Sequence, residues 1–260
     1  MNKEMDPAKL FSLEGRVSVI TGASGGLGGK ISSAFAGLGS TVVLVGRNVE
    51  KLTALKGEIE AAGGKVSIQQ ADVLDADGMD RMAEAVHRKL GKIDILVTAH
   101  GVNLRVPSID YPLDKWQEVV DVNLRGTFVA CRAAGRHMIR QRSGKIVNIS
   151  STAGDSGYEW GYSAYAPSKG GVDSLTRTLA VEWGKYGICV NSVAPYFVRT
   201  ELTSEFLSDP KRYRKIVGSI PLGRLGLPSD VVGAVVFLAS PAADWISGQV
   251  VHVDGGYMAH

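Results

Sequence analysis

The fold is decided by the stretch RVSVITGASGGLG, residues 16–28. A β-branched, apolar run over 16–20 stops at a cluster of glycines, after which apolar residues resume at helical spacing. This order predicts a strand, a tight turn and a helix. Because Gly22, Gly26 and Gly28 lack a Cβ, backbone N–H groups can approach a phosphate closely, and the positive end of the next helix faces the same anion. The stretch predicts a phosphate-binding turn, and an ordinary flexible turn is the alternative if nothing else in the chain agrees.

Strand and helix patterns alternate along the rest of the chain. Further strands are predicted over 41–45, 66–70, 93–98, 145–149, 188–193 and 249–253, and helices over 49–62, 76–90, 113–122, 124–142, 164–186 and 229–239. The segment between the predicted strand 188–193 and the predicted helix 229–239 is expected to be irregular. Such alternation is typical of right-handed βαβ crossovers. We therefore expect one α/β domain over residues 1–260, with a Rossmann-type, doubly wound parallel sheet of about seven strands and helices on both faces.

Composition narrows the class of protein. With 260 residues and 45% hydrophobic content, the chain can bury a sizeable core. The net charge of +3 is mild and both signs are interspersed, which argues against a nucleic-acid partner. The first nine residues are polar and no apolar run reaches membrane-spanning length, so we expect no signal peptide, no membrane association and a cytoplasmic location.

The residues that commonly bind metals are few and scattered. Cys131 and Cys189 are the two cysteines, without a C-x-x-C spacing, and we expect both to be packing thiols. The five histidines also lack ligand spacing. The sequence predicts no protein-bound metal.

Arg47 follows the second predicted strand, at the distance from the glycines where a nucleotide ribose is read. A carboxylate here would favour NAD(H), but Gly46 and Arg47 offer space and a planar cation suited to a 2′-phosphate. The sequence therefore favours NADP(H) over NAD(H), with a solvated loop arginine as the alternative. Asp72, after the third strand, is placed to accept from an adenine amino group or to cap a helix.

Tyr165 and Lys169 are four residues apart near the start of a predicted helix, so they share a helical face. An adjacent ammonium favours a phenolate and can lower the pKa of a tyrosine by roughly 1–3 units. Tyr165 could then exchange a proton with an alcohol or carbonyl oxygen while a cofactor carries the hydride. The pair alone is equally typical of two surface residues on a helix.

Two further residues make this pattern more specific. Ser151 follows the predicted strand 145–149, and its hydroxyl could hold a substrate oxygen. Asn123 falls between two helical stretches, where its amide can interrupt the backbone ladder and hold a water behind Lys169. Each alone could simply be a cap. The joint occurrence of these residues with Tyr165 and the glycine turn predicts a catalytic site.

These motifs resemble those of the short-chain dehydrogenase/reductase family over essentially the whole chain. The family's T-G-x-x-x-G-x-G turn matches residues 21–28, and its Asn-Ser-Tyr-Lys tetrad falls on Asn123, Ser151, Tyr165 and Lys169. The C-terminal stretches 221–224, 247–249 and 253–256 are also similar. The resemblance implies a single-domain Rossmann fold that assembles as a homotetramer, and the glycine-arginine context of Arg47 resembles the NADP(H)-preferring type.

The resemblance also implies which residues contact the cofactor. Thr200 matches the residue that binds the carboxamide, and Val198 matches the one whose backbone does so. With the residues already discussed, the full expected set is Gly22, Ser24, Gly26, Leu27, Gly28, Arg47, Asp72, Val73, Ala99, Gly101, Tyr165, Lys169, Pro195, Val198 and Thr200.

Two departures from the family pattern stand out. The family's Asn-Asn-Ala-Gly reads Thr-Ala-His-Gly over 98–101, so we expect an altered cofactor seat in which His100 fills space near the ribose. The family's Pro-Gly reads Pro195-Tyr196, which replaces a flexible residue by an aromatic one beside the nicotinamide.

The substrate is read in this family by the segment between the serine and the tyrosine and by a lid, here roughly 200–217. Aromatic residues over 155–162 suit a sugar ring or an alkyl or aryl ketone. Arg105 and Arg199 hint at an acidic or hydroxylated substrate, and the basic run 211–215 is either a solvated helix face or an anion-attracting patch.

The resemblance leans towards gluconate and polyol dehydrogenases and carbonyl reductases, which implies an enzyme that interconverts an alcohol and a ketone. A 3-oxoacyl thioester reductase is the alternative, because it shares nearly all the motifs. A non-catalytic NADP(H)-binding regulatory protein is a further alternative, which loss of Tyr165 or Lys169 would favour, and both are present.

Overall fold

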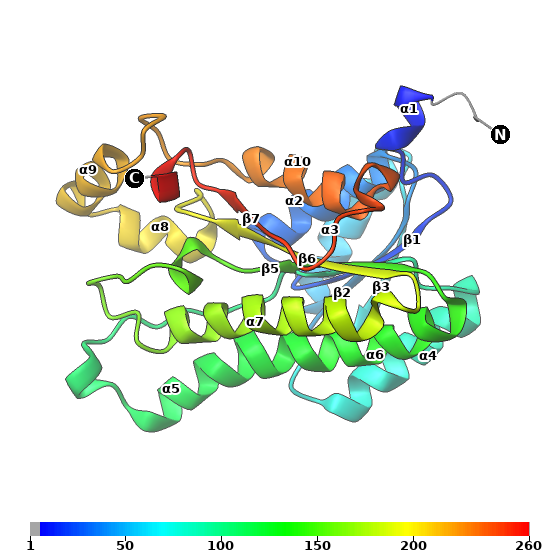
Figure 1. The fold of residues 1–260 in the computed structure, drawn as a ribbon, viewed down its shortest axis with the longest axis horizontal. Coiled ribbons are helices and arrows are strands. Elements are labelled where there is room, and N and C mark those ends of the chain that lie inside the picture. Colours follow the sequence, from blue (N-terminus) through cyan, green and yellow to red (C-terminus); the bar gives the residue numbers. More distant parts are fainter. Residues whose placement is uncertain (1–5, 260) are drawn as a thin grey trace.

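One parallel sheet passes through the middle of the computed structural model, which describes residues 6–259 (Figure 1). Its seven strands lie in the order β3-β2-β1-β4-β5-β6-β7. Their bounds are β1 Val17–Thr21, β2 Thr41–Gly46, β3 Lys65–Gln70, β4 Ile95–Thr98, β5 Gly144–Ile149, β6 Ile188–Pro195 and β7 Val250–Val253. The predicted doubly wound α/β fold is confirmed. Residues 1–5 and 260 of the expected domain lie outside the described range.

Helices cover both faces of the sheet (Figure 1). On one face α2, α3 and α10 pack together, and on the other α4, α6 and α7 do. The helices are α1 Pro7–Leu10, α2 Gly26–Gly37, α3 Val49–Ala61, α4 Ala76–Leu90, α5 Leu113–Val120, α6 Gly126–Gln141, α7 Tyr165–Gly184, α8 Glu201–Leu207, α9 Pro210–Gly218 and α10 Pro228–Ala239. Short 3₁₀ turns are η1 Ser108–Asp110, η3 Thr152–Gly154, η4 Pro241–Ala243 and η5 Tyr257–Ala259.

The central strands are continuous apolar runs because helices cover them on both sides. Alternate side chains enter two separate cores: Ile20 of β1 packs towards α2 and α10, whereas Val19 packs towards α4 and α6. Every residue of β1 is buried, but the edge strand β3 is only partly buried. The sheet therefore carries two cores rather than one.

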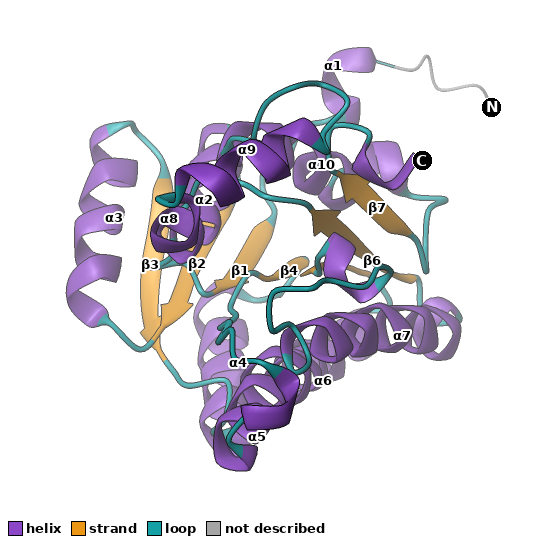
Figure 2. Ribbon diagram, turned by 90° about the vertical axis from the view of Figure 1, so that its left-hand side faces the viewer, coloured by secondary structure: helices purple, strands orange, loops and turns teal. Residues whose placement is uncertain are grey.

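The chain reverses its direction of winding between β1 and β4. After β1 it builds β2 and β3 on one side and then returns to place β4 on the other, so that Thr21 and Thr98 are register partners at the carboxyl ends of their strands. Crevices at such a reversal are where open α/β sheets bind ligands. Figure 2 looks onto this edge, with α8 and α9 above it.

Two segments differ from expectation. The segment between β6 and α10 is not irregular, because it forms α8 and α9: Thr200 and Thr203 make a capping box on α8, and Asp209 caps α9 before Pro210. The helices predicted over 113–122 and 124–142 are joined by a π-helical turn, η2 Asp121–Arg125, rather than separated.

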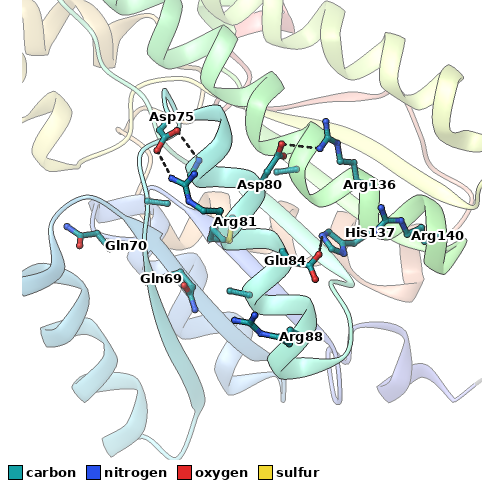
Figure 3. A pocket seen from close by; sticks show the side chains of 15 residues that line it. Gln69, Gln70, Asp75, Asp80, Arg81, Glu84, Arg88, Arg136, His137 and Arg140 are labelled. Atoms are coloured by element: carbon teal, nitrogen blue, oxygen red, sulfur yellow. Dashed lines mark hydrogen bonds and ion pairs between the residues drawn. The ribbon is translucent and has the colours of Figure 1, made fainter.

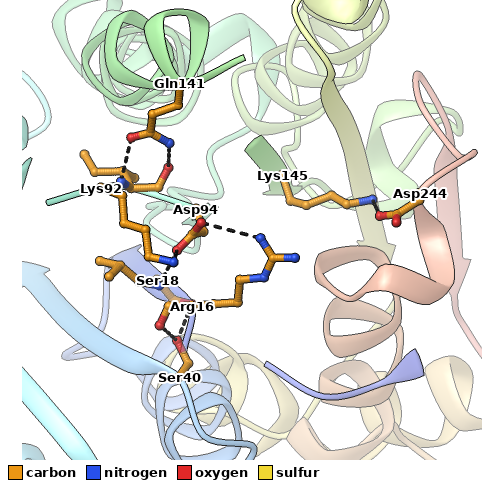
Figure 4. A network of polar contacts seen from close by, with 10 residues as sticks. Arg16, Ser18, Ser40, Lys92, Asp94, Gln141, Lys145 and Asp244 are labelled. Carbon is orange, nitrogen blue, oxygen red and sulfur yellow. Dashed lines mark hydrogen bonds and ion pairs between the residues drawn. The ribbon is translucent and has the colours of Figure 1, made fainter. Parts of the chain in front are cut away.

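A polar network ties the sheet together at the opposite, amino-terminal edge (Figure 4). Asp94 accepts from the backbone N–H of Val17 at 2.8 Å and pairs with Arg16 at 3.5 Å and Lys92 at 3.0 Å. This carboxylate joins the starts of β1 and β4, far from the edge at which ligands bind.

Candidate active site

The glycine turn between β1 and α2 is shaped by contacts that exclude side chains. Gly22 has a φ of +68°, and a Cβ there would lie 2.5 Å from the backbone nitrogen of His100. A Cβ on Gly28 would overlap the carbonyl oxygen of Gly22. The first turn of α2 carries no acidic residue and its N-cap, Gly25, makes no side-chain capping bond. The turn fits a bound pyrophosphate, because the first N–H groups of α2, before that of Gly29, precede its hydrogen-bond ladder and can donate to an anion.

Two neighbouring cavities meet at this turn. The larger, about 460 Å³, is lined by Gly25, Gly26, Leu27, Gly28, Ala99, His100, Gly101, Ile149, Ser150, Ser151, Tyr165, Lys169, Pro195, Tyr196, Val198, Thr200, Glu201, Leu202 and Thr203. The smaller, about 200 Å³, is lined by Gly22, Ser24, Gly25, Val45, Gly46, Arg47, Ala71, Asp72, Val73, Ala99, His100, Gly101, Val102 and Val122. Between them they bring together every residue of the expected cofactor set.

Ser151 and Tyr165 lie next to each other in the lining of the larger cavity. Ser151 follows β5 and its hydroxyl accepts from the backbone N–H of Ala153 at 3.2 Å. Tyr165 is the first residue of α7, and its phenol hydrogen-bonds with Ser151. The N-cap of this helix is Ala164, which makes no side-chain capping bond. The start of α7 thus places the Tyr165 phenol, and the end of β5 the Ser151 hydroxyl, next to each other in the larger cavity.

The ionisation of Tyr165 and Lys169 differs from expectation. Burial raises the pKa of Tyr165 to about 12, although Ser151 and Arg105 oppose the rise. The Lys169 ammonium donates to the carbonyl of Ile149 at 2.8 Å, and its nitrogen lies 5.7 Å from the centroid of the Tyr165 ring. Burial lowers the pKa of Lys169 to about 8. The predicted lowering of the Tyr165 pKa by Lys169 is therefore wrong for this structure: burial outweighs the groups that lower this pKa, and Lys169 is not one of them.

Asn123 is buried in the π-helical turn and does not line either cavity. Its amide donates to the Val102 carbonyl and to the Ser168 hydroxyl, both at 3.0 Å, and its oxygen accepts from the Val102 N–H at 2.9 Å. Its backbone carbonyl accepts from Thr127 at 2.7 Å. The wider turn directs Asn123 at α7 and at the loop after β4, and a water held there stays a prediction.

His100 lines both cavities and connects two parts of the site. Its Nδ1 lies 2.7 Å from the Thr21 hydroxyl, and its Nε2 lies 3.5 Å from that of Thr127. Burial and the charge of Lys169 lower the pKa of His100 to about 3, so the imidazole is neutral. A Cβ on Gly126 would lie 3.2 Å from Nε2, so the glycine leaves room for the ring. His100 fills space, as expected, and also hydrogen-bonds the end of β1.

Arg47 lies at the outer end of the smaller cavity. Its guanidinium is 72% exposed and lies 3.9 Å from the Asp72 carboxylate. Asp72 also accepts from the backbone N–H of Leu74 at 3.0 Å, whereas Asp75 caps α4. The alternative that Asp72 caps a helix is therefore wrong.

A cluster of aromatic rings lies beside the larger cavity, which Tyr196 of this cluster lines. Tyr196 packs edge to face on Phe197, with centroids 4.9 Å apart. The further members of this cluster are Tyr158, Trp160, Tyr162, Phe206 and Tyr257. Arg105 donates to the Tyr162 hydroxyl at 3.1 Å and stacks 4.1 Å above Phe206. Arg199 donates to the hydroxyl of Tyr213.

The basic run 211–215 lies on α9, beside this cluster. Lys215 pairs with Glu159, and Arg212 stacks 4.8 Å above the Phe206 ring. Lys215 therefore joins the lid to the aromatic segment after Ser151, whereas Arg212 contacts another residue of the lid. Of the two cysteines, Cys131 is buried as expected, but Cys189 is only partly buried.

The sequence did not single out two residues close to the site. Asp173 lies one turn after Lys169 on α7, and Tyr257 lies in η5 near the end of the chain. The four-residue spacing was visible in the sequence, but nothing in the sequence pattern places Tyr257 against Tyr196.

A larger cavity, about 790 Å³, lies elsewhere, between α4, α6 and the edge strand β3 (Figure 3). Its charged side chains pair largely with one another, as Arg81 does with Asp75 and Arg136 with Asp80. Over residues 6–259 no group of three or more His, Cys, Asp or Glu side chains could hold a metal ion. None of the helices in that range is long and apolar enough to cross a membrane.

Known proteins are similar to this chain in sequence and in fold. A family profile described as Enoyl-(Acyl carrier protein) reductase matches residues 22–258. Gluconate 5-dehydrogenase of Gluconobacter oxydans is 37% identical over 252 residues, which are 97% of this chain and 98% of that protein. A 3-oxoacyl-[acyl-carrier-protein] reductase of Synechocystis is 38% identical over 249 residues, 95% of this chain and 98% of that one.

A solved structure of a related protein has the same fold. The crystal structure of a gluconate 5-dehydrogenase from Burkholderia cenocepacia, in complex with NADP and tartrate, superimposes with a TM-score of 0.95. It is 32% identical and the match covers 98% of this chain and 100% of that one. The resemblance noted in the sequence is confirmed: the chain belongs to the short-chain dehydrogenase/reductase family and is an oxidoreductase of that family.

Proposed function

We propose that this protein is an NADP(H)-dependent oxidoreductase that interconverts a secondary alcohol and a ketone. The observation that carries the proposal is the convergence of Ser151, Tyr165 and Lys169 with the glycine turn on one cavity of about 460 Å³. NADP(H), when bound along the two cavities, supplies or accepts the hydride. The side chains supply the proton and hold the substrate.

Ser151 and Tyr165 act on the same substrate oxygen. Their hydrogen bond places two hydroxyls side by side, so a carbonyl oxygen can accept from both as negative charge develops on it. Tyr165 is protonated at neutral pH, because its pKa is about 12, and is ready to donate in the direction of reduction. In the direction of oxidation it must first lose that proton, which the cationic Arg105 favours.

Lys169 and Asn123 form the proposed proton pathway that leads away from Tyr165. The Lys169 ammonium is fixed by the Ile149 carbonyl and lies on the same helical face as the phenol. Asn123 bridges the loop after β4 to Ser168 on α7, and its side-chain amide is the group proposed to hold a relay water behind Lys169. The remaining residues of the expected cofactor set bind NADP(H) through the contacts that the resemblance implies.

Arg47 supports NADP(H) over NAD(H). Its exposed guanidinium flanks the outer end of the smaller cavity, where a 2′-phosphate would lie. A planar cation suits a phosphate, and no carboxylate stands at the end of β2 to bind a 2′-hydroxyl instead.

The proposed substrate is a keto-sugar, a polyol or a small ketone. Aromatic faces such as Tyr162 suit a sugar ring, and Arg105 beside them suits a carboxylate or hydroxyl groups. The relationship to gluconate 5-dehydrogenases favours this class. A 3-oxoacyl thioester is the second candidate, favoured by the relationship to the Synechocystis reductase.

We further propose a single domain over 1–260 with residues 200–217 as the substrate lid, in a cytoplasmic homotetramer. In support, α8 and α9 lie above the carboxyl edge of the sheet (Figure 2). Phe128 on α6 and Val181 on α7 are 43% and 83% exposed, and such apolar residues on the long helices suit burial against another subunit.

The test is the initial rate of NADPH oxidation with keto-sugars, keto-acids, a 3-oxoacyl thioester and simple alkyl and aryl ketones, each repeated with NADH. We expect turnover with a keto-sugar or keto-acid and NADPH. Turnover with the thioester alone would select the second candidate. Tight NADPH binding without turnover of any compound would favour a regulatory protein.

A further inference from the structure

Asp173 is a fully buried carboxylate on α7, one helical turn beyond Lys169. Its Oδ2 accepts from Ser150 at 2.8 Å and its Oδ1 accepts from Ser192 at 2.7 Å. A Cβ on Gly154 would lie only 2.8 Å from Oδ2, so the carboxylate is closely enclosed. Buried carboxylates are rare unless they balance a charge or serve a site.

Lys169 is a buried cation on the same helix as this buried carboxylate. Its side chain is 3% exposed, and its ammonium donates a hydrogen bond to a neutral acceptor, the carbonyl of Ile149. A buried ammonium loses its hydration, so it tends to release its proton unless an anion lies close by. Asp173 is four residues away on the same helical face, and its charge opposes the effect of burial on the Lys169 pKa.

We propose that Asp173 is a positioning residue that keeps Lys169 cationic and, through Ser150, fixes the end of β5 that carries Ser151. This inference rests on the proposed function for the role of Lys169, but the charge relationship itself does not. Ser150 also donates to the backbone carbonyl of Lys169 at 3.2 Å, so one hydroxyl connects strand, carboxylate and lysine.

The other charged groups around this pair do not replace Asp173. Asp155 follows η3 and is occupied by His252 of β7, whose Nε2 lies 2.8 Å from its carboxylate. His100 is neutral because burial and Lys169 lower its pKa, and Tyr165 is protonated because burial raises its pKa. Asp173 is thus the anion available to Lys169 from α7 and from the elements packed against it.

The test is Asp173→Asn, which keeps the shape and removes the charge. We expect the pKa of Lys169 to fall by about one unit, because loss of a nearby opposite charge changes a pKa by about one unit or more. The dissociation constant of NADP(H), followed by fluorescence between pH 6 and 9, should then begin to rise at a pH lower by about one unit. The alkaline limb of kcat should move the same way.

Thr176→Val is the matched control, because Thr176 is also buried on α7 and hydrogen-bonds to Asn148 of β5. It should lower Tm and leave both pH profiles in place. Coincident profiles for Asp173→Asn and the wild type would overturn the proposal. Since the binding titration needs no turnover, absence of activity in the wild type would refute the proposed function and leave this test intact.

A second measurement applies if Asp173→Asn alone does not fold. Without its anion the buried Lys169 ammonium is uncompensated, so the same change made together with Lys169→Met should fold and cost much less in Tm. If Asp173→Asn lowered Tm equally with lysine and with methionine at position 169, Asp173 would act only as the hydrogen-bond acceptor of Ser150 and Ser192, and the proposal would fail.

Discussion

The ring of Tyr196 stacks on the ring of Tyr257, with centroids 3.9 Å apart and planes within 9° of parallel. Tyr196 stands where the family has a glycine, and the contact holds it against the C-terminal turn η5. Its hydroxyl lies 3.2 Å from that of Ser219, beyond the lid. The C-terminal turn therefore braces one wall of the larger cavity.

Tyr257→Ala should loosen this wall without disturbing the cofactor turn. Stacked aromatic pairs contribute about 0.5–1.5 kcal/mol, so we expect the KM for the ketone to rise by roughly 2- to 10-fold. The KM for NADPH should hardly change. Tyr186→Ala, just beyond the end of α7, is the control. A Tyr257 variant with an unaltered ketone KM would show that the wall does not contact substrate.

Tyr165→Phe removes the phenolic proton and keeps the ring. Because general acid catalysis contributes about 100- to 10,000-fold, kcat should fall by at least about 100-fold, with NADPH binding retained. Tyr213→Phe, which loses a comparable hydroxyl bonded to Arg199, should keep most of its activity. Stopped-flow rates and a fluorescence binding titration measure the two properties, and near-normal turnover would remove Tyr165 as the acid.

Arg47→Asp places a negative charge where the 2′-phosphate is proposed to lie. Charge-assisted hydrogen bonds contribute about 1.5–3 kcal/mol, so kcat/KM for NADPH should fall by roughly 10- to 100-fold. The value for NADH should stay level or improve. Arg81→Asp, whose arginine lies on α4 outside both cofactor cavities, is the control. Equal losses with both cofactors would remove the phosphate assignment.

Lys169 should reduce the stability of the fold at neutral pH. Burial lowers its pKa from 10.5 to about 8, so the unfolded chain binds the proton more tightly than the folded chain. That penalty, about 3 kcal/mol, applies in full below pH 8 and disappears as the pH rises towards 10.5. Lys169→Met should therefore raise the free energy of unfolding at pH 7, with a smaller gain at pH 9.5, while abolishing turnover.

Urea unfolding at the two pH values measures this effect. Protonation of Asp173, whose pKa is itself raised by burial, limits the cost of leaving that carboxylate without its cation. A gain in stability that does not change between pH 7 and pH 9.5 would contradict the assignment of the penalty to the ammonium.

The regular elements could be read from the sequence because periodicity is a local property. The strand, turn and helix at residues 16–28 lie where expected, and so do the parallel strands that follow. Strands that are apolar throughout, such as β2, also predict a sheet covered on both faces. Tyr165 and Lys169 were predictable as a pair because helical spacing alone brings them together.

Ionisation and long-range packing could not be read in this way. The pKa of Tyr165 depends on how deeply the finished fold buries it, and Lys169 in turn forms its hydrogen bond with a carbonyl at the end of β5. The stacking of Tyr257 on Tyr196 depends on the path of the chain after β7. The π-helical turn at Asn123 arises from contacts with Val102 and α7, which no local pattern encodes.

The pairing of β1 with β4 has a consequence for how the protein folds. Thr21 and Thr98 are neighbours in the sheet, although β2 and β3 are synthesised between them. Gly22 owes its tight fit to the backbone at His100, so the phosphate-binding turn lacks its final shape until β4 docks. Such non-local contacts form slowly, because loop closure must precede them. NADPH can therefore stabilise only a late stage of folding, and it should slow unfolding far more than it speeds the early steps of refolding.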